Sequence, residues 1–486
     1  MKIQSLYIPD FLILKDFKIQ FDTNQDFAII IGDNGSGKST LLEVVAYIFG
    51  HLHKYFVLND KTAEFIDGYE IEFISNYKSQ DYKIFLKSIY VKQKTNTFKP
   101  LIKVNDVEMS LSQIEKEFGG FANFLPSRIG VYYAGEAKFL QVLSEHFEKK
   151  FITELIKKDN PFSLMPLNLP KERPFYYIKD EYLGIILLAL LSKCQHEKEI
   201  LNLLKKLIGD FDVNDVVTKI ILKKPDWATT ESGELWGINS KFVSQFVTKL
   251  NENSSKVETD EKNEKISYWY FGLIDIIQLF EDSKELDFPF VIFDTLLYNG
   301  ILDKIEVVFK MSSGIEIESE RLSEGQRQFI VTSGLSALWK DRENKLFLYD
   351  EPDVFLHPRW QREFIPFLRS YFNNSFALLT THNPALLSDV NREQVILFRN
   401  GKIINKTFRT LGKEYDRLLV DYFGLEHTRS IEASKLFESL HNQIRENSQD
   451  KESFKINFEK LQEMVGKDDK DLLMLNFAFR KANEKN

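Results

Sequence analysis

The segment with the clearest chemistry in this sequence is a glycine-rich stretch of nine residues near its beginning. It has the pattern G-x-x-x-x-G-K-S, in which glycines let successive backbone N–H groups turn inward toward an anion. The lysine would reach the β- and γ-phosphates of a nucleotide, and the serine after it would place its hydroxyl on Mg²⁺. The residues that we predict to bind the nucleotide are Gly32, Asp33, Asn34, Gly35, Ser36, Gly37, Lys38, Ser39 and Thr40.

Two neighbouring carboxylates form a second candidate group. Asp350 and Glu351 directly follow the apolar run Leu346–Tyr349. Taken alone, two acids after a strand usually form a surface turn, but their position downstream of a phosphate-binding loop favours a chemical role. We predict that Asp350 holds Mg²⁺ through water and that Glu351 polarises the water that attacks the γ-phosphate.

A histidine is the third candidate. His382 follows the apolar run Phe376–Thr380. The carboxyl end of a strand in an α/β sheet faces the ligand crevice, so His382 would donate a hydrogen bond to the γ-phosphate there. A lone histidine is more often a structural residue, and this assignment therefore depends on the two motifs above.

The fourth motif is Leu322-Ser323-Glu324-Gly325-Gln326, at the start of an expected helix. Ser323 is a natural N-cap, and a capped helix start is the simplest interpretation. In combination with the other motifs, however, the stretch is similar to the signature motif of the ABC-type ATPases. That resemblance implies that Ser323, Gly325 and Gln326 contact the nucleotide on the phosphate loop of an opposite protomer. Two ATP molecules would then lie between two heads, so that hydrolysis requires a dimer.

The branch within that superfamily is indicated by the residues after Asp350. They read D-E-P-x-x-x-L-H-P, a form that includes Asp353, which we also assign to nucleotide binding. With Thr381-His382-Asn383-Pro384 and the early Ile8-Pro9-Asp10-Phe11, this form resembles the SMC/RecF/OLD-like ATPases. It resembles more closely the stand-alone ATPases of bacterial anti-phage systems, namely the Septu, PARIS and retron-associated subunits.

Three features depart from these relatives. Gly135-Glu136 stands where the Q-loop glutamine is expected. The segment between the phosphate loop and the signature is broken by prolines and lacks sustained heptads, which indicates a compact head without a long coiled coil. The OLD nucleases add a carboxylate-rich domain after the histidine motif. The acids of the tail here, Asp468, Asp469 and Asp471, instead stand at an expected helix start, where they suit the helix dipole, so we do not expect a nuclease in this chain.

The elements that must position these residues follow from the apolar patterns. Buried strands are expected directly before the phosphate loop, the carboxylate pair and the histidine, in alternation with helices, which predicts a parallel α/β core. Glu181–Lys206 and Tyr268–Phe280 have a helical pattern, whereas Asn251–Lys265 is polar and is expected to be a loop or the tip of a helical arm. Ile305–Met311 and Gly314–Ser319 are expected to pair and return the chain to the core.

The expected fold is therefore an α/β P-loop NTPase of the ABC-ATPase head type, with an antiparallel β layer, a helical insert and a helical C-terminal tail. Antiparallel strands are expected at Ile3–Ile8, Leu12–Phe21, Tyr69–Ile74, Tyr82–Val91 and Leu101–Val104. The predicted domains are the first part of the head (1–137), the insert (138–300), the second part of the head (301–412) and the tail (413–486).

Composition limits the partners and the compartment. The chain has 486 residues, 43% of them hydrophobic, and a formal net charge of −8, so contact with nucleic acid would need local basic patches. Such patches could come from the lysine pairs 149–150, 157–158, 205–206 and 223–224, although such pairs are more often solvated helix faces.

Cys194, the one cysteine, excludes a disulfide framework and is expected in the core. The longest apolar run, Leu183–Leu191, is too short to span a bilayer, and we expect a cytoplasmic protein without a membrane partner.

Three functions remain open at this level. The first is an ATP- and Mg²⁺-dependent sensor or scaffold that forms a homodimer or a larger homo-oligomer. In an anti-phage system it would respond to DNA or a phage component and control a separate nuclease effector. The second is a DNA-repair or recombination ATPase that acts directly on DNA. The third is the ATPase subunit of a transporter, which the D-E-P-x-x-x-L-H-P form disfavours.

Overall fold

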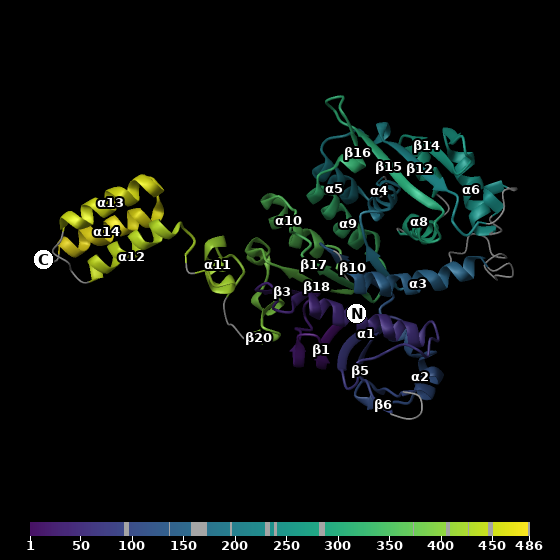
Figure 1. Cartoon of the computed structure of the whole chain (residues 1–486), viewed down its shortest axis with the longest axis horizontal. Helices are drawn as coiled ribbons and strands as arrows, with labels where there is room; N and C mark the ends of the chain where they lie inside the picture. Colours follow the sequence, from purple (N-terminus) through teal and green to yellow (C-terminus); the bar gives the residue numbers. More distant parts are fainter. Residues whose placement is uncertain are drawn as a thin grey trace. The chain divides into compact units, whose positions relative to one another are not determined.

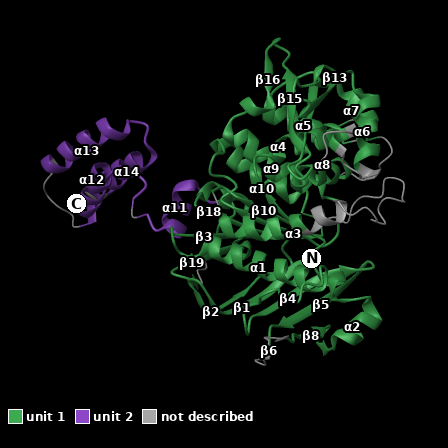
Figure 2. Ribbon diagram, turned by 45° about the vertical axis from the view of Figure 1, so that its right-hand side comes forward, with its two compact units in different colours: residues 1–412 green, residues 413–486 purple. Residues whose placement is uncertain are grey.

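The computed structural model describes residues 1–91, 97–135, 137–156, 173–194, 197–228, 234–237, 241–280, 287–372, 374–404, 409–425, 427–445 and 451–484. The chain forms two compact units, residues 1–412 and residues 413–486 (Figure 2). Within the described part of the chain, no helix combines the length and the apolar character that crossing a membrane requires.

A seven-stranded sheet forms the centre of the first unit (Figure 1). Its order is β11-β10-β17-β18-β3-β19-β20, and every neighbouring pair is parallel except β19 with β20. The expected parallel α/β core is therefore confirmed. Its strands are β3 (Phe27–Gly32), β10 (Arg128–Tyr133), β11 (Phe175–Ile178), β17 (Lys345–Asp350), β18 (Ser375–Thr381), β19 (Val395–Arg399) and β20 (Lys402–Ile404).

Helices cover both faces of this sheet, which explains why its strands are nearly continuous apolar runs. On one face lies α1 (Lys38–Phe56), between the central sheet and a second sheet (Figure 2). On the other face, α9 (Glu324–Leu338) packs its side chains on β10 and β17, and α10 (Pro358–Arg369) packs on α9. The central sheet is thus covered on both faces, and the predicted site residues begin at the carboxyl ends of its strands.

The second sheet is the expected antiparallel layer. Its order is β2-β1-β4-β5-β8-β9, with the short pair β6 and β7 and the helix α2 beside it. Its apolar side chains join those of α1 and the central sheet in one core. The bounds are β1 (Lys2–Phe11), β2 (Leu14–Gln20), β4 (Glu70–Tyr77), β5 (Gln80–Lys87), β6 (Tyr90–Val91), β7 (Thr97–Phe98), β8 (Leu101–Val104), β9 (Val107–Glu108) and α2 (Leu111–Phe118).

The middle of the chain is not purely helical, in contrast to the expectation for the insert. It contains a five-stranded antiparallel sheet in the order β13-β14-β12-β15-β16, packed with helices (Figure 1). The strands are β12 (Val217–Lys223), β13 (Lys256–Thr259), β14 (Lys265–Phe271), β15 (Leu302–Lys310) and β16 (Glu316–Glu318). The helices are α3 (Lys138–Ile156), α4 (Tyr182–Leu191), α5 (Lys198–Ile208), α6 (Lys241–Asn253), α7 (Leu273–Leu279) and α8 (Phe288–Tyr298).

Three local predictions in this region are wrong. The expected loop at 251–265 contains the strand β13, and the first part of the expected helix 268–280 is β14. The strand β13 is fully exposed at the sheet edge, so it has no apolar alternation from which it could be recognised. Similarly, the expected pair of strands near residues 305–319 forms, but it joins this sheet through β12 instead of the central sheet.

The expected helix at 181–206 is divided into α4 and α5. All ten residues of α4 are buried, because it lies between α8, α9 and β15. Cys194 follows it in the core, as expected, and burial raises the pKa of its thiol to about 12.

The described residues of the second unit form four helices, α11 (Tyr415–Phe423), α12 (Ile431–Arg445), α13 (Lys451–Val465) and α14 (Lys470–Glu484). The last three share a small apolar core that includes Phe437, Leu440 and Leu461. Asp469 accepts hydrogen bonds from the first backbone N–H groups of α14 and pairs with Arg429. Asp469 thus stands at a helix start, as expected from the sequence, and the structure shows that it also caps the helix.

A buried ion pair connects the central sheet to the middle region and gives a stability prediction. The guanidinium of Arg173, before β11, donates to Asp294 on α8 at 2.9 Å and to Glu148 on α3 at 2.9 Å. Replacing Arg173 with Met should lower the free energy of unfolding by about 3–5 kcal/mol, because a buried carboxylate loses its partner. Replacing Asp294 with Leu in the same variant should restore most of that loss, as measured by chemical denaturation. Equal stability of the single variant and the wild type would contradict this prediction.

Candidate active site

The phosphate-loop residues connect β3 to α1, as predicted. Gly32 has a φ of +155°, and a Cβ there would lie 2.0 Å from the carbonyl oxygen of Phe398 on β19, so only glycine fits. The turn between β19 and β20 closes over the loop, since the backbone N–H of Gly401 donates to the carbonyl of Ser36 at 2.8 Å. Gly37 is the N-cap of α1, and the amino end of a helix attracts anions.

Lys38 is buried at the centre of this loop. Its ammonium donates to the carbonyls of Gly32 and Asp33, each at 3.0 Å. Burial lowers the pKa of Lys38, and the carboxylates of Glu351 and Asp350 act in the opposite direction. A buried ammonium surrounded by glycine backbone, at the amino end of a helix, is the arrangement that binds phosphate groups.

Ser39 and Asp350 meet at the carboxyl ends of β3 and β17, although they are 311 residues apart in sequence. The hydroxyl of Ser39 donates to Oδ1 of Asp350 at 2.9 Å, and the hydroxyl of Thr380 donates to the same atom at 2.7 Å. Burial raises the pKa of Asp350, an effect that these two hydrogen bonds oppose.

The chemistry of this group suits Mg²⁺, which prefers oxygen ligands and keeps several waters. The described residues contain no cluster of three or more histidine, cysteine or acidic side chains that would hold a metal alone. The hydroxyl of Ser39 and the carboxylate of Asp350 are the groups here that could hold such an ion.

Glu351 and His382 form a pair beside Asp350. Nε2 of His382 lies 3.0 Å from Oε1 of Glu351, and both side chains are about one-third exposed. Burial lowers the pKa of His382, and so does the neighbouring Lys38, whereas the carboxylate of Glu351 acts in the opposite direction. Glu351 has a φ of +49°, a left-handed conformation that is rare for a residue with a side chain.

Asp353, predicted to bind nucleotide, lies 3% exposed in the loop after β17. Its carboxylate accepts a hydrogen bond from the hydroxyl of Thr381 at 3.0 Å. Burial raises the pKa of Asp353 to about 6. In the single chain its visible role is thus to hold this loop against the end of β18.

The signature residues lie at the amino end of α9. Ser323 is exposed and caps α9 through a reciprocal pair of hydrogen bonds with Gln326, as expected for a helix start. Gln326 also donates to the carbonyl of Leu207 at the end of α5, at 2.7 Å. A Cβ at Gly325 would lie 2.4 Å from the carbonyl oxygen of Phe355, so glycine lets the helix approach the loop after β17.

A family model described as an AAA ATPase domain matches residues 1–387, which span both the phosphate loop and the carboxylate pair. The chain belongs to this AAA ATPase domain family.

Two individual relatives share less than a quarter of their aligned residues with this chain. The Retron Vc95 probable ATPase of Vibrio cholerae serotype O1 biovar El Tor is 22% identical over 434 residues, which cover 80% of this chain and 71% of that protein. The Septu protein PtuA of Bacillus thuringiensis is 24% identical over 225 residues, which cover 40% of this chain and 51% of that protein. Among solved structures, the SMC head domain from Thermotoga maritima matches with a TM-score of 0.33 and 11% identity, over 84% of this chain and 100% of that one.

The structure of this AAA ATPase domain adds site residues that the sequence analysis missed. Thr380 bonds to Asp350, and Gln328 on α9 bonds to the backbone on both sides of Asp353. Tyr133, at the end of β10, shares a hydrogen bond with Ser39. A signal for Tyr133 and Thr380 existed, because both stand near the carboxyl end of an apolar strand; in the structure both are in register with Asp350. Glu136, in the region of the expected Q-loop, lies outside the described residues.

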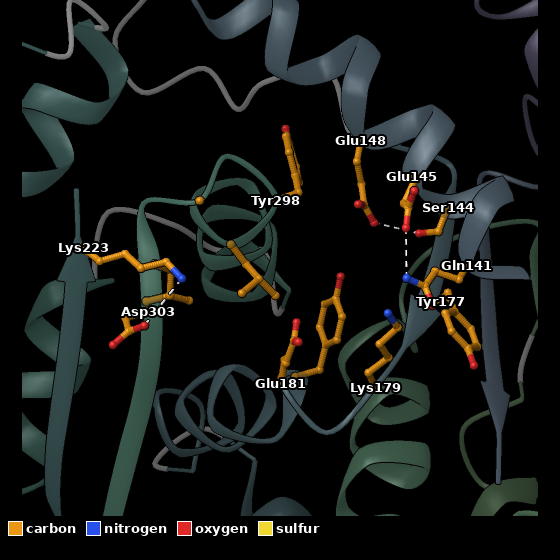
Figure 3. A pocket seen from close by; sticks show the side chains of 14 residues that line it. Gln141, Ser144, Glu145, Glu148, Tyr177, Lys179, Glu181, Lys223, Tyr298 and Asp303 are labelled. Carbon is orange, nitrogen blue, oxygen red and sulfur yellow. Dashed lines mark hydrogen bonds and ion pairs between the residues drawn. The ribbon is translucent and has the colours of Figure 1, made fainter. Parts of the chain in front are cut away.

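A polar cavity of about 370 Å³ lies in the middle region of the AAA ATPase domain (Figure 3). Glu145 and Glu148 on α3 lie on one side of it, and Lys223 on β12 and Asp303 on β15 lie across from them. None of the residues predicted to bind nucleotide lines this cavity, so it is distinct from the phosphate-loop site.

Proposed function

We propose that this chain hydrolyses ATP at a site formed by two copies, and that hydrolysis gates an anti-phage defence system with a separately encoded nuclease effector. The proposal that the chain hydrolyses ATP rests on one observation. Ser39 contacts Asp350, and Glu351 contacts His382, at the carboxyl ends of the central strands and close to Lys38. These are the charge-stabilising and water-orienting groups that phosphoryl transfer to water requires.

In this proposal each residue has one task. Lys38 and the loop N–H groups bind the β- and γ-phosphates of ATP. Ser39 and Asp350 hold Mg²⁺, which neutralises charge on those phosphates when bound. Glu351 accepts a hydrogen bond from the attacking water and orients it, while His382 turns its Nε2–H from Glu351 to the γ-phosphate when ATP is bound.

The second copy is supported by the surface around the signature. Ser323 is exposed at the amino end of α9, and the contacts of Gly325 and Gln326 are with Phe355 and α5. In the loop that Gly325 contacts, Val354 is 50% exposed and Phe355 is 49% exposed. Exposed apolar side chains beside an exposed helix start suit a protein interface, and an ATP-mediated dimer would cover both features.

The role in defence rests on the relatives, whose names place them in a retron and in a Septu system. Direct action on DNA is less well supported. Four of the lysines in the basic pairs already have acidic partners, namely Lys149 with Glu145, Lys205 with Asp210, Lys206 with Glu363 and Lys223 with Asp303. Lys157 and Lys158 lie outside the described residues. Little positive charge therefore remains in the described part of these pairs for a phosphate backbone.

The dimeric site is tested by Ser323→Arg. The variant should bind ATP through its own intact loop and lose turnover, because the arginine blocks closure of two heads. Ser110→Arg is the matched control, since Ser110 forms the same capping arrangement with Gln113 on α2. Both variants should lose about 1 kcal/mol of stability with the cap, and only Ser323→Arg should lose turnover.

Mixing Ser323→Arg with Lys38→Ala sharpens this test. A mixed dimer has one site with an intact loop and an intact signature, and another site with both lesions. We expect partial recovery of phosphate release on mixing two variants that are inactive alone. Full activity of Ser323→Arg by itself would contradict the shared site.

A further inference from the structure

Gln328 lies on α9, one turn beyond the signature motif, and its side chain is 2% exposed. Its amide nitrogen Nε2 donates to the backbone carbonyl of Glu351 at 3.2 Å. Its amide oxygen Oε1 accepts from the backbone N–H of Phe355 at 3.3 Å. One buried side chain thus holds the loop after β17 at two points, four residues apart.

The contact between Gln328 and Glu351 matters because Glu351 has a left-handed backbone conformation. A left-handed backbone at a residue with a side chain persists only where its surroundings hold it. The N–H of Glu351 donates to the hydroxyl of Thr380 at 3.0 Å, and its carbonyl accepts from Gln328. Both peptide groups of Glu351 are therefore held by side chains, one from β18 and one from α9, and its carbonyl also accepts from the backbone N–H of Val354 at 3.3 Å.

The same part of α9 touches this loop a second time. The backbone of Gly325 packs against the carbonyl of Phe355, close enough that a Cβ would collide. The start of α9 and the loop after β17 consequently form one packed piece. A change in the position of α9 would be passed to Glu351 through the amide of Gln328.

We propose that Gln328 is a positioning residue, which keeps the carboxylate of Glu351 in its hydrolytic orientation and ties that orientation to the signature helix of the same chain. This inference rests on the proposed function, in which Glu351 orients the attacking water. It assigns to α9 a role within its own site as well as across the interface.

The test compares Gln328→Met with Gln328→Glu. Methionine keeps the volume and loses both bonds, whereas glutamate keeps the acceptor for Phe355 and replaces the amide that donates to Glu351 with a carboxyl group. Both variants should lower kcat between about tenfold and a hundredfold, because a catalytic group is misplaced. ATP affinity, measured by calorimetry, should stay within about twofold, because Lys38, Ser39 and Asp350 are unchanged.

Gln361→Met is the matched control. Gln361 donates to the carbonyl of Asp353 in the same loop, at 3.4 Å, and has no bond to Glu351 in the described structure. Its kcat should stay near that of the wild type. Wild-type kcat in Gln328→Met would overturn the proposal, since it would show that neither bond from this side chain to the loop is needed.

A crystal structure of Gln328→Met gives a readout that is independent of turnover. Glu351 should leave the left-handed region, and an unchanged φ near +49° would overturn the proposal. The two proposals can fail separately. If the wild type hydrolyses no ATP, the proposed function fails. The φ angle of Glu351 in the crystal structure of Gln328→Met would still show whether Gln328 holds this residue in place.

Discussion

Glu351→Gln is expected to lower the rate of ATP hydrolysis by a factor on the order of 10² to 10⁴, the usual contribution of a general base. In the wild type, Nε2 of His382 lies 3.0 Å from Oε1 of Glu351. The amide of the variant is nearly the same size as the carboxylate, and its oxygen can still accept this hydrogen bond. The local geometry should therefore survive, while the negative charge that polarises the attacking water is lost.

ATP affinity of this variant should stay within about twofold of the wild type, because the phosphate and magnesium contacts that we propose belong to Lys38, Ser39 and Asp350. The variant should then accumulate as an ATP-bound dimer or larger assembly on size exclusion. Phosphate release at saturating ATP and calorimetry measure the two effects. Glu316→Gln, on the exposed strand β16, controls for the loss of one negative charge. Turnover within twofold of the wild type would show that Glu351 is not the base.

Lys38→Ala should lower ATP affinity by roughly 100-fold, or about 2.7 kcal/mol, the free energy of one or two charge-assisted hydrogen bonds. Its ammonium is buried and bonded only to carbonyls of its own loop, Gly32 and Asp33, among the contacts the structure describes. Without it, the phosphates would meet backbone N–H groups but no positive side chain at the centre of the loop.

Lys345→Ala is the control for the removal of a buried lysine. Lys345 begins β17, its ammonium donates to the carbonyl of Lys340 at 2.9 Å, and burial lowers its pKa to about 8. Any general destabilisation should appear in both variants, whereas the loss of ATP binding should appear only in Lys38→Ala. Near-normal affinity of Lys38→Ala by calorimetry would contradict the assignment of the phosphate site.

The local motifs were readable from the sequence because each combines neighbouring residues with a short apolar strand. The phosphate loop follows β3, Asp350 and Glu351 follow β17, and His382 follows β18. Parallel strands bring their carboxyl ends to one edge, so the sequence alone predicted that these residues would meet. Caps were equally predictable, since Ser323 and Gln326 bond within one turn.

The sheet of the middle region could not be predicted in the same way. The strand β13 is fully exposed, and its backbone bonds to β14 determine its conformation without any apolar alternation. The pair β15 and β16 was recognised, but nothing local says that β12, far earlier in the chain, is the partner of β15.

The sequence by itself determined which residues could bind phosphate and magnesium, because those roles depend on residue type and on position at a strand end. Only the tertiary structure decided how these residues are oriented. Ser39 reaches Asp350 across 311 residues, and Gln328 and Thr380 hold the two peptide groups of Glu351 from separate elements. Such hydrogen bonds depend on distances of a few tenths of an ångström between distant segments, and close packing of the whole core sets those distances.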